Sequence, residues 1–183
     1  MHAGRIDTPK NQIVLCKVFD RLVKDGEDVV LLIAGAKQST EIYSKLEQYF
    51  SERIQYLGER NDVPDLMAYS DAMCLSSIWE GLPVTLLEAL SVGCVPICTP
   101  VGGIPDVIKD NWNGILSTSA SEEGYFQAVK RFISMSDIDY SKIKSDCTKT
   151  RYNLKNFIPS PFLIGPNMVT FSLKFVTFNN FIK

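Results

Sequence analysis

Short apolar runs alternate with segments of helical periodicity along most of this sequence, and this alternation constrains the fold more than any other feature. The run VVLLIAG at 29–35 is continuously aliphatic and ends in glycine, as expected of a strand buried on both faces of a parallel sheet. The runs IQYLG at 54–58, AMCLS at 72–76 and VPICT at 95–99 repeat the pattern. We therefore predict buried parallel strands at these four places.

Helices are predicted between and after these strands. Apolar residues from Ile13 to Val23 recur at helical spacing, and Gly26 ends that segment. Further helices are expected at about 39–50, after Pro64, from Pro83, after Pro105 and in two segments after residue 121. Strands and helices in this order, with short connections, specify right-handed crossovers. The predicted fold is α/β, with a doubly wound, Rossmann-like parallel sheet that binds ligands beyond the carboxyl ends of its strands.

The domain organisation follows from length and from a change in pattern near residue 150. A chain of 183 residues is long enough for one domain with its own core. We expect this core domain to span 1–150. The remaining segment, 151–183, is an atypical tail in which Phe171, Leu173 and Phe175 alternate with polar residues at the period of a strand.

Charge and cysteine content narrow the partners and the compartment. The formal net charge of −2 gives no sign of a surface for polyanions, so nucleic acid is not an expected partner. The five cysteines are odd in number and lack the paired spacing of a zinc site, which indicates reduced thiols of a cytosolic protein. The sequence shows neither an apolar stretch of membrane-spanning length nor a secretory signal. We expect a cytoplasmic protein, with the inner face of the membrane as one place where it works.

Two carboxylates interrupt the apolar run SSIWEGLPVTLLEALSVG at 76–93. Pro83 suits the first position of a helix, so Glu80 precedes that helix and Glu88 lies in its second turn, on the same face as Thr85. A carboxylate buried without partners is costly, and the adjacent hydroxyls of a sugar or ribose would supply donors. Two plainer interpretations remain open. Glu88 would then pair with a surface Arg or Lys, and Glu80 would be an ordinary loop acid.

Three further features suit an anionic ligand. Gly81 lacks a Cβ, so a phosphate could approach the backbone where a helix N-terminus offers free N–H groups. In GRIDTPKNQ at 4–12, Arg5 and Lys10 flank a short loop and would clamp a diphosphate, although most cations near a terminus are merely solvated. The segment VGGIPDVI at 101–108 is either another anion-binding turn or a plain turn.

These segments, taken in order, resemble the C-terminal, nucleotide-sugar-binding half of the retaining GT-B glycosyltransferases, specifically glycosyltransferase family 4, also called group 1. The resemblance runs from Gly4 to about Met135. GRIDTPKNQ resembles the family's G-R-x-x-x-x-K-N segment, and EGLPVTLLE its E-x7-E motif. The stretch from 54 to 77 resembles the base-side loop with its following strand, and the stretch from 93 to 108 the closing strand with its Gly-Gly turn.

The resemblance implies a role for each matching residue. It implies a transferase that moves a hexosyl unit, with retention, from a nucleoside diphosphate sugar, without a metal or other cofactor. Arg5, Lys10 and Glu80 are the implied catalytic residues, because the two cations would stabilise the leaving diphosphate and Glu80 would hold hydroxyls of the transferred sugar. The implied substrate-binding residues are Gly4, Arg60, Asn61, Val63, Gly81, Leu82, Pro83, Thr85 and Glu88, with 60–63 along the base and Glu88 on the ribose.

The sequence also departs from the family. Only three residues precede Gly4, so we expect a truncated first strand, no acceptor domain, and a His2 that lies in a frayed terminus. The expected acceptor is a saccharide or a lipid-linked saccharide, reached through the missing N-terminal domain in polysaccharide or glycoconjugate biosynthesis, with peripheral membrane association of the full enzyme. The main alternative is an isolated nucleotide-sugar-binding module or inactive fragment. A nucleoside diphosphate sugar epimerase is a lesser alternative, and the absence of G-x-G-x-x-G opposes a dinucleotide oxidoreductase.

Overall fold

Parallel strands form at all four places that the sequence predicts, but only three of them are largely buried. The strand at 54–58 is the exception, because it lies at the edge of its sheet and buries only Ile54. The computed structural model describes residues 1–153, and in it these strands are β2 (Leu31–Ala34), β3 (Ile54–Gly58), β4 (Ala72–Leu75) and β5 (Val95–Cys98). Two strands of two residues each join them, β1 (His2–Ala3) and β6 (Ile115–Leu116). β6 was not predicted, because two residues are too few to show a period.

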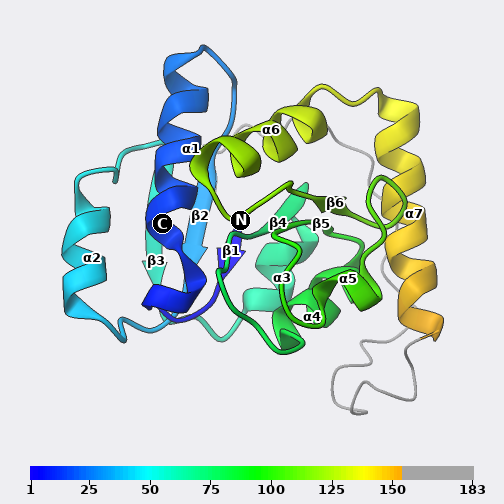
Figure 1. The fold of residues 1–183 in the computed structure, drawn as a ribbon, viewed down its shortest axis with the longest axis horizontal. Helices are drawn as coiled ribbons and strands as arrows, with labels where there is room; N and C mark the ends of the chain where they lie inside the picture. Colours follow the sequence, from blue (N-terminus) through cyan, green and yellow to red (C-terminus); the bar gives the residue numbers. More distant parts are fainter. Residues whose placement is uncertain (154–183) are drawn as a thin grey trace.

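The strands form two three-stranded sheets, β1-β2-β3 and β4-β5-β6, in which every pairing is parallel. Two hydrogen bonds of Met1 connect the sheets. Its carbonyl accepts from the Cys74 N–H at 2.7 Å, and its ammonium group donates to the Ala72 carbonyl at 2.6 Å. β1 therefore lies beside β4, and the strands run in the order β3-β2-β1-β4-β5-β6, which is that of a Rossmann sheet (Figure 1).

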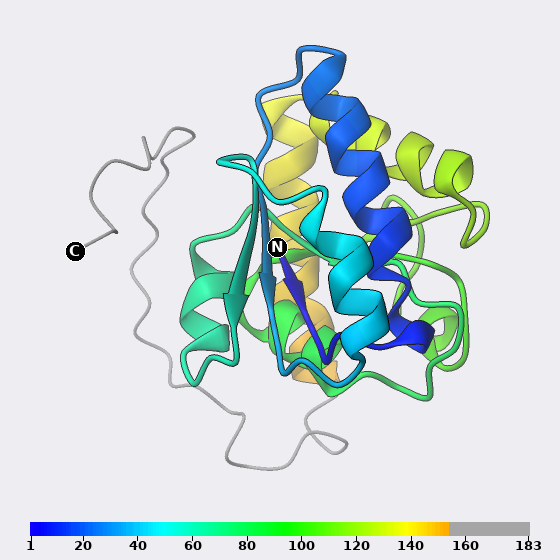
Figure 2. The ribbon, with the colours of Figure 1, turned by 90° about the vertical axis from the view of Figure 1, so that its left-hand side faces the viewer.

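Helices cover both faces of this sheet. One group, which packs together, is α1 (Gln12–Lys24), α2 (Thr40–Glu47) and α6 (Glu122–Ile133), and the other is α3 (Val63–Ala68), α4 (Val84–Val92) and α7 (Asp137–Asn153). Figure 2 shows α3 on one side of the strands and α1 with α2 on the other. The short helices η1 (Thr8–Lys10) and α5 (Ile104–Val107) lie in connections. The predicted doubly wound α/β fold is confirmed.

Most helix bounds agree with the predicted ones, and one terminus needs correction. α4 begins at Val84 rather than Pro83, because Pro83 has an extended ψ of 128° and serves as the N-cap. Its carbonyl accepts the Leu86 N–H at 3.1 Å. The predicted strand-like alternation at 171–175 lies outside the described residues, as does most of the predicted tail. Within residues 1–153, no helix combines the length and apolarity that a membrane crossing requires.

The core is built from aliphatic side chains of the strands and of the helix faces that cover them. All five cysteines are buried and free, as the sequence indicates. The side chains with no exposed surface include Leu15 and Leu22 of α1, Ile33 of β2 and Leu90 of α4. Because the strands and helix faces are apolar, the polar residues predicted for the site lie mainly in the loops that follow the strands.

Candidate functional site

Two of the predicted catalytic residues, 70 positions apart in the sequence, meet in an ion pair. The Lys10 Nζ lies 2.7 Å from the Glu80 Oε1, which also accepts a hydrogen bond of 2.7 Å from the Ser77 hydroxyl. The Glu80 side chain is only 8% exposed, so Glu80 is not an ordinary loop acid. Among the described residues none donates to its other carboxylate oxygen, Oε2, which remains available to a ligand.

The Gly-Gly turn after β5 holds the loop that carries Glu80. The Gly103 N–H donates to the Gly81 carbonyl at 2.8 Å, and a Cβ at Gly102, whose φ is +56°, would lie 1.9 Å from the Glu80 carbonyl oxygen. The Thr99 hydroxyl adds a 2.5 Å hydrogen bond to the Ser77 carbonyl. Close packing against the loop thus explains this turn and favours the plain-turn interpretation over anion binding.

The third predicted catalytic residue, Arg5, follows β1 at the same edge of the sheet. Its side chain is exposed and pairs with no carboxylate among residues 1–150. Its backbone, by contrast, is tightly held. The Gly4 N–H donates to the Ala34 carbonyl at 2.9 Å, and a Cβ at Gly35 would lie only 2.0 Å from the Gly4 carbonyl oxygen. The backbone at Arg5 is therefore fixed, while the Arg5 guanidinium has no carboxylate partner among residues 1–150.

The expectation that His2 lies in a frayed terminus is wrong. His2 has no exposed surface, because β1 is inserted between β2 and β4. The His2 Nδ1 lies 2.9 Å from the Cys74 carbonyl oxygen, and Nε2 lies 3.2 Å from the Gln12 Nε2. Burial lowers the pKa of this imidazole from 6.5 to about 4, so the ring is neutral near pH 7.

Glu88 is half-buried in the second turn of α4. Burial raises the pKa of its carboxyl group, and no Lys or Arg among the described residues pairs with it. This contradicts the interpretation of Glu88 as a partner in a surface ion pair. Nearby, a Cβ at Gly81 would meet nothing within 4 Å, and no side chain caps the N-terminus of α4. The E-x7-E segment thus has open space and uncapped N–H groups between its two carboxylates.

The predicted base-side residues lie in the loop from β3 to α3, and they form no hydrogen bond or ion pair with Lys10 or Glu80. Arg60 binds its neighbour Asp62 with both arms of the guanidinium, at 2.8 and 2.5 Å, and both side chains are substantially exposed. Asn61 is exposed, and Val63 opens α3. The loop follows β3 and therefore shares the carboxyl edge of the sheet with the other predicted site residues.

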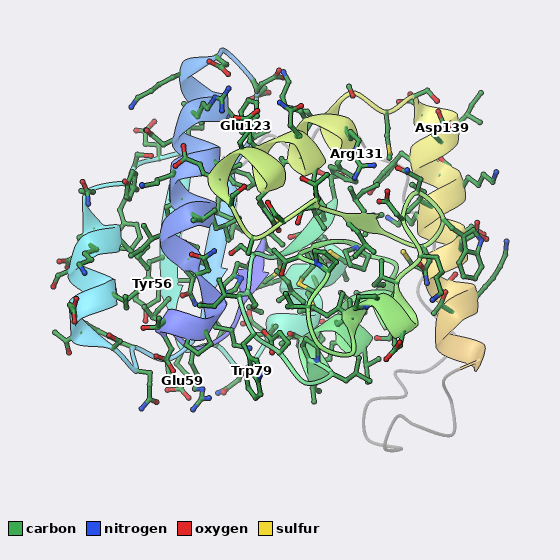
Figure 3. All side chains as sticks on the ribbon, viewed as in Figure 1. Tyr56, Glu59, Trp79, Glu123, Arg131 and Asp139 are labelled. Carbon is green, nitrogen blue, oxygen red and sulfur yellow. The ribbon has the colours of Figure 1, made fainter. Side chains whose placement is uncertain are left out.

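Exposed apolar side chains flank Glu80 in the sequence, and their exposure was not predicted. Trp79 is 71% exposed, and Ile78, Leu82 and Val84 are also exposed. In Figure 3, Trp79 lies at the lower edge of the molecule, as does Glu59 of the β3–α3 loop. That edge is where the carboxyl ends of the strands lie (Figure 1).

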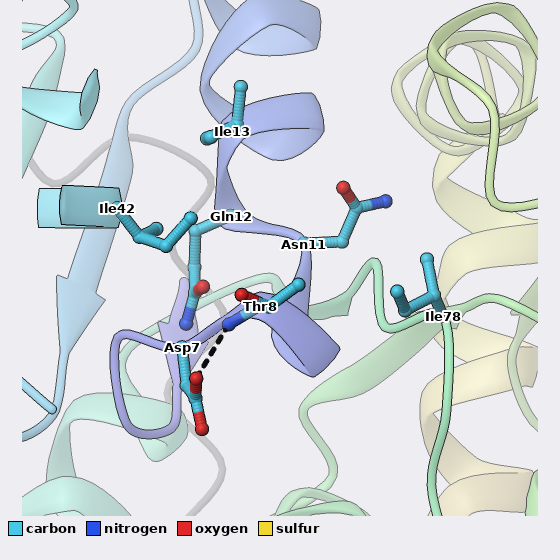
Figure 4. A pocket seen from close by; sticks show the side chains of 7 residues that line it. All are labelled: Asp7, Thr8, Asn11, Gln12, Ile13, Ile42 and Ile78. Atoms are coloured by element: carbon cyan, nitrogen blue, oxygen red, sulfur yellow. Dashed lines mark hydrogen bonds between the residues drawn. The ribbon is translucent and has the colours of Figure 1, made fainter. Parts of the chain in front are cut away.

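A small cavity opens beside the start of α1. Asp7, Thr8, Asn11, Gln12, Ile13, Ile42 and Ile78 line it (Figure 4). Its volume of about 110 Å³ is below the roughly 300 Å³ at which pockets for small ligands begin. None of the predicted site residues lines it, and the Asp7 carboxylate is occupied by the Thr8 N–H at 2.8 Å. The described part of the chain also contains no cluster of His, Cys, Asp and Glu that would hold a metal.

Comparison with known proteins identifies the family of the chain. The model of the family described as glycosyl transferases group 1 matches residues 1–152. A curated relative, the UDP-Gal:alpha-D-GlcNAc-diphosphoundecaprenol alpha-1,3-galactosyltransferase of Escherichia coli, is 26% identical over 133 residues, which are 70% of this chain and 34% of the relative. The chain spans about a third of the length of the first curated relatives that it matches.

Solved structures share the fold. The C-terminal domain of a glycosyl transferase group 1 family protein from Francisella tularensis superposes with a TM-score of 0.71 at 23% identity, over 83% of each chain. HepE of Anabaena in complex with UDP-glucose gives a TM-score of 0.73 at 19% identity, over 85% of this chain and 47% of that one. The fold is that of the C-terminal half of a GT-B glycosyltransferase. Since the family model matches nearly all of the described residues, this chain belongs to the glycosyl transferases group 1 family.

Proposed function

We propose that residues 1–150 bind a nucleoside diphosphate sugar and form the donor-binding half of a retaining glycosyltransferase that moves a hexosyl unit. The observation that carries this proposal is the Lys10–Glu80 pair at the carboxyl edge of the sheet, with the free guanidinium of Arg5 after β1. A bound diphosphate would replace Glu80 as the partner of the Lys10 ammonium group. Glu80 would then accept hydrogen bonds from hydroxyl groups of the sugar. One ion pair is thus exchanged for two ligand contacts.

The chemistry that this arrangement supports is electrostatic. When the bond between the anomeric carbon and the diphosphate oxygen breaks, negative charge gathers on the leaving diphosphate, and the anomeric carbon bonds to an acceptor oxygen. Arg5 and Lys10 would stabilise that charge, Arg5 through its planar fork and Lys10 as a point charge. The proton of the acceptor hydroxyl would pass to the diphosphate oxygen that leaves, so no residue of the described chain is proposed to take it.

The remaining contacts are proposed from position. The half-buried Glu88 would accept from the two ribose hydroxyls, and the backbone from Gly81 to Pro83, with Leu82 and Thr85, would line the sugar and phosphates. Gly4 would lie under the diphosphate, while Arg60, Asn61 and Val63 would lie along the base. The Anabaena structure, which contains UDP-glucose on the same fold, supports a nucleoside diphosphate sugar as the ligand class.

The acceptor side is proposed by analogy with the relatives. A saccharide or a lipid-linked saccharide would bind through a further domain, as in polysaccharide or glycoconjugate biosynthesis in the cytoplasm or at a membrane surface. The Escherichia coli relative, whose name specifies a GlcNAc-diphosphoundecaprenol acceptor, supports a lipid-linked substrate. We propose that the segment 151–183 is a tail outside the donor domain.

Calorimetric titration of the chain with UDP, GDP, ADP and their sugars tests the donor site. We expect one of these nucleotides to bind, and Glu88→Ala to weaken the binding about tenfold or more, since a charge-assisted hydrogen bond contributes roughly 1.5–3 kcal/mol. A 2′,3′-dideoxy analogue lacks the ribose hydroxyls, so its affinity should be the same for both proteins. Glu52→Ala, at an exposed position before β3 on the opposite edge, is the matched control.

Two results would contradict the proposal. One is the absence of binding to every nucleotide tested, and the other is an equal loss of affinity for the ribose and dideoxy forms in Glu88→Ala. Release of free sugar from the donor, or its transfer, by the chain alone would exclude the alternative of a pure binding module.

A further inference from the structure

Two buried polar side chains, Gln12 and His2, contact the turn that carries Arg5. Neither has any exposed surface. The Gln12 Nε2 donates to the Arg5 carbonyl at 2.7 Å, and the His2 Nε2 lies 3.3 Å from the position that a Cβ on Gly4 would occupy. No role was predicted for Gln12, and His2 was expected in a frayed terminus. Two buried side chains without a predicted role therefore lie beneath the predicted diphosphate site.

The hydrogen bonds of this layer run in a defined direction. The Cys74 carbonyl only accepts, so the His2 Nδ1, at 2.9 Å, carries the ring proton and Nε2 is an acceptor. One amide proton of Gln12 is donated to this Nε2, at 3.2 Å, and the other to the Arg5 carbonyl. A continuous chain of hydrogen bonds thus connects the central strand β4 to the Arg5 backbone through two side chains.

The two acceptors, the His2 Nε2 and the Arg5 carbonyl, set the orientation of the Gln12 amide. In this orientation the Gln12 Oε1 is buried and receives no hydrogen bond from the described residues. Buried polar atoms are rarely left unpaired, so this one calls for an explanation. The explanation offered by the geometry is that both amide protons are needed where they are, one on the His2 ring and one on the Arg5 carbonyl.

We propose that Gln12 and His2 are positioning residues that fix the Arg5 backbone through its carbonyl, so that the Arg5 guanidinium is presented to a diphosphate beside Lys10. This inference rests on the proposed function, because it needs Arg5 to bind the diphosphate. Gly4 has no Cβ to restrict its backbone, so its conformation must be imposed by neighbours. Holding the arginine backbone in advance reduces the conformational freedom that Arg5 loses when it binds.

A double-mutant cycle on the full chain tests this inference. The variants are Arg5→Ala, Gln12→Met and the combination, and the probe is whichever of UDP, GDP and ADP the unmodified chain binds most tightly, measured by calorimetry. Met has about the volume of Gln but donates no hydrogen bond. We expect Arg5→Ala to weaken binding about tenfold or more and Gln12→Met about fivefold. The double variant should bind no more weakly than Arg5→Ala alone, because Gln12 acts only through Arg5.

Two controls separate positioning from a general structural effect. Gln12→Met combined with Glu88→Ala should lose affinity by the product of the two single effects, because Glu88 lies on α4 and shares no hydrogen bond with Gln12 or His2. His2→Phe provides a second route if Gln12→Met fails to fold. It removes both ring nitrogens and should also weaken binding, less than Gln12→Met, with no further loss in the Arg5→Ala background. Urea unfolding checks that each variant is folded.

The outcomes distinguish this inference from the proposed function. Independent, multiplicative effects of Gln12→Met and Arg5→Ala, or no effect of Gln12→Met and of His2→Phe, would overturn the positioning role while the donor site stands. Unchanged affinity in Arg5→Ala would overturn it together with the role of Arg5. Absence of nucleotide binding to the unmodified chain would overturn the donor site and the positioning role together.

Discussion

At the scale of single residues, one pair of charges in the predicted site is satisfied internally and two other charged groups are not. Glu80 is nearly buried and would be costly without a partner, and Lys10 with Ser77 supplies two donors to one of its oxygens. Arg5 and Glu88 have no such partners among the described residues. A ligand would therefore have to break the Lys10–Glu80 ion pair, whereas it could bind Arg5 and Glu88 without breaking any ion pair of the described residues.

Lys10→Met tests the stabilising part of this pair. The variant leaves the Glu80 carboxylate largely buried with only Ser77 as a donor, and we expect the free energy of unfolding to fall by about 2 kcal/mol, because the Lys10 side chain is 22% exposed and water screens part of the interaction. Adding Glu80→Gln should restore about half of the loss, since the buried charge is then gone. Urea denaturation measures both. A double variant less stable than Lys10→Met would contradict this account.

His2 gives a prediction for the dependence of stability on pH. Its pKa is lowered by burial from 6.5 to about 4, so the unfolded chain binds a proton in this range and the folded chain does not. The stability of the folded state is therefore unaffected by His2 above about pH 6.5 and falls as the pH approaches 4. Relative to His2→Phe, the protein should lose about 3 kcal/mol of unfolding free energy between pH 7 and pH 4. A constant difference between the two proteins over this range would be contrary to this prediction.

The sequence showed which residues have the right chemistry but not which neighbours hold them. Glu80 and Lys10 were both predicted, and their contact follows from the shared edge of the sheet, yet nothing in GRIDTPKNQ indicates that Gln12 turns inward. His2 was misplaced because its burial depends on β4, which is 70 residues away along the chain. A pairing of two strands at that separation leaves no local pattern. One signal was present, the polar Gln12 among the apolar positions of a helix.

At the scale of elements, local periodicity predicted the helices and strands that are long enough to show it, and β6 and η1 were missed. α1, β2, β3, β4 and β5 were found because each has enough residues to show a period or a continuous apolar run. β6 has two residues and forms because β5 supplies its partner, whereas η1 has three residues and is held by local hydrogen bonds within the segment from Asp7 to Asn11. Pro83 shows the limit of a positional rule, since its φ of −65° suits a first helical residue but its ψ of 128° does not.

The turn from β5 to α5 allows a matched comparison of two glycines. Gly102 and Gly26 both have positive φ, but a Cβ at Gly102 would lie 1.9 Å from the Glu80 carbonyl oxygen, whereas one at Gly26 would meet nothing within 4 Å. Gly26→Ala should cost about 1–2 kcal/mol from backbone strain alone. Gly102→Ala should cost more than about 3 kcal/mol, because the loop carrying Glu80 must also move. Thermal unfolding of both variants tests this, and equal losses would show that the contact is unimportant.

At the scale of the whole molecule, the fold depends on the junction between β1 and β4. The helix α1 and the strands β2 and β3 lie on one side of that junction, and β5 and β6 lie on the other. The alternation of strands and helices in the sequence predicted the class of fold correctly. It did not predict that so short a strand would connect the two halves, because strand order is decided by packing rather than by any local pattern.

Leu22→Ala tests whether the halves unfold together. Leu22 is fully buried in α1, so the variant should lose about 2–5 kcal/mol of unfolding free energy. Both tryptophans, Trp79 and Trp112, lie in the other half. If the domain is one cooperative unit, the urea midpoint from tryptophan fluorescence should shift as far as the midpoint from circular dichroism. A fluorescence midpoint that stays in place would show that the halves unfold separately.

The buried cysteines have a practical consequence. Burial raises the pKa of Cys16, Cys94 and Cys147 to about 12, so these thiols stay protonated and enclosed in the native state and react slowly with alkylating reagents. A brief pulse of such a reagent would mark only molecules that have opened. Cys16 lies on α1 and Cys98 on β5, so mass spectrometry of the labelled peptides would report the opening of each half separately. The chain thus contains its own reporters of transient opening, one on each side of the junction.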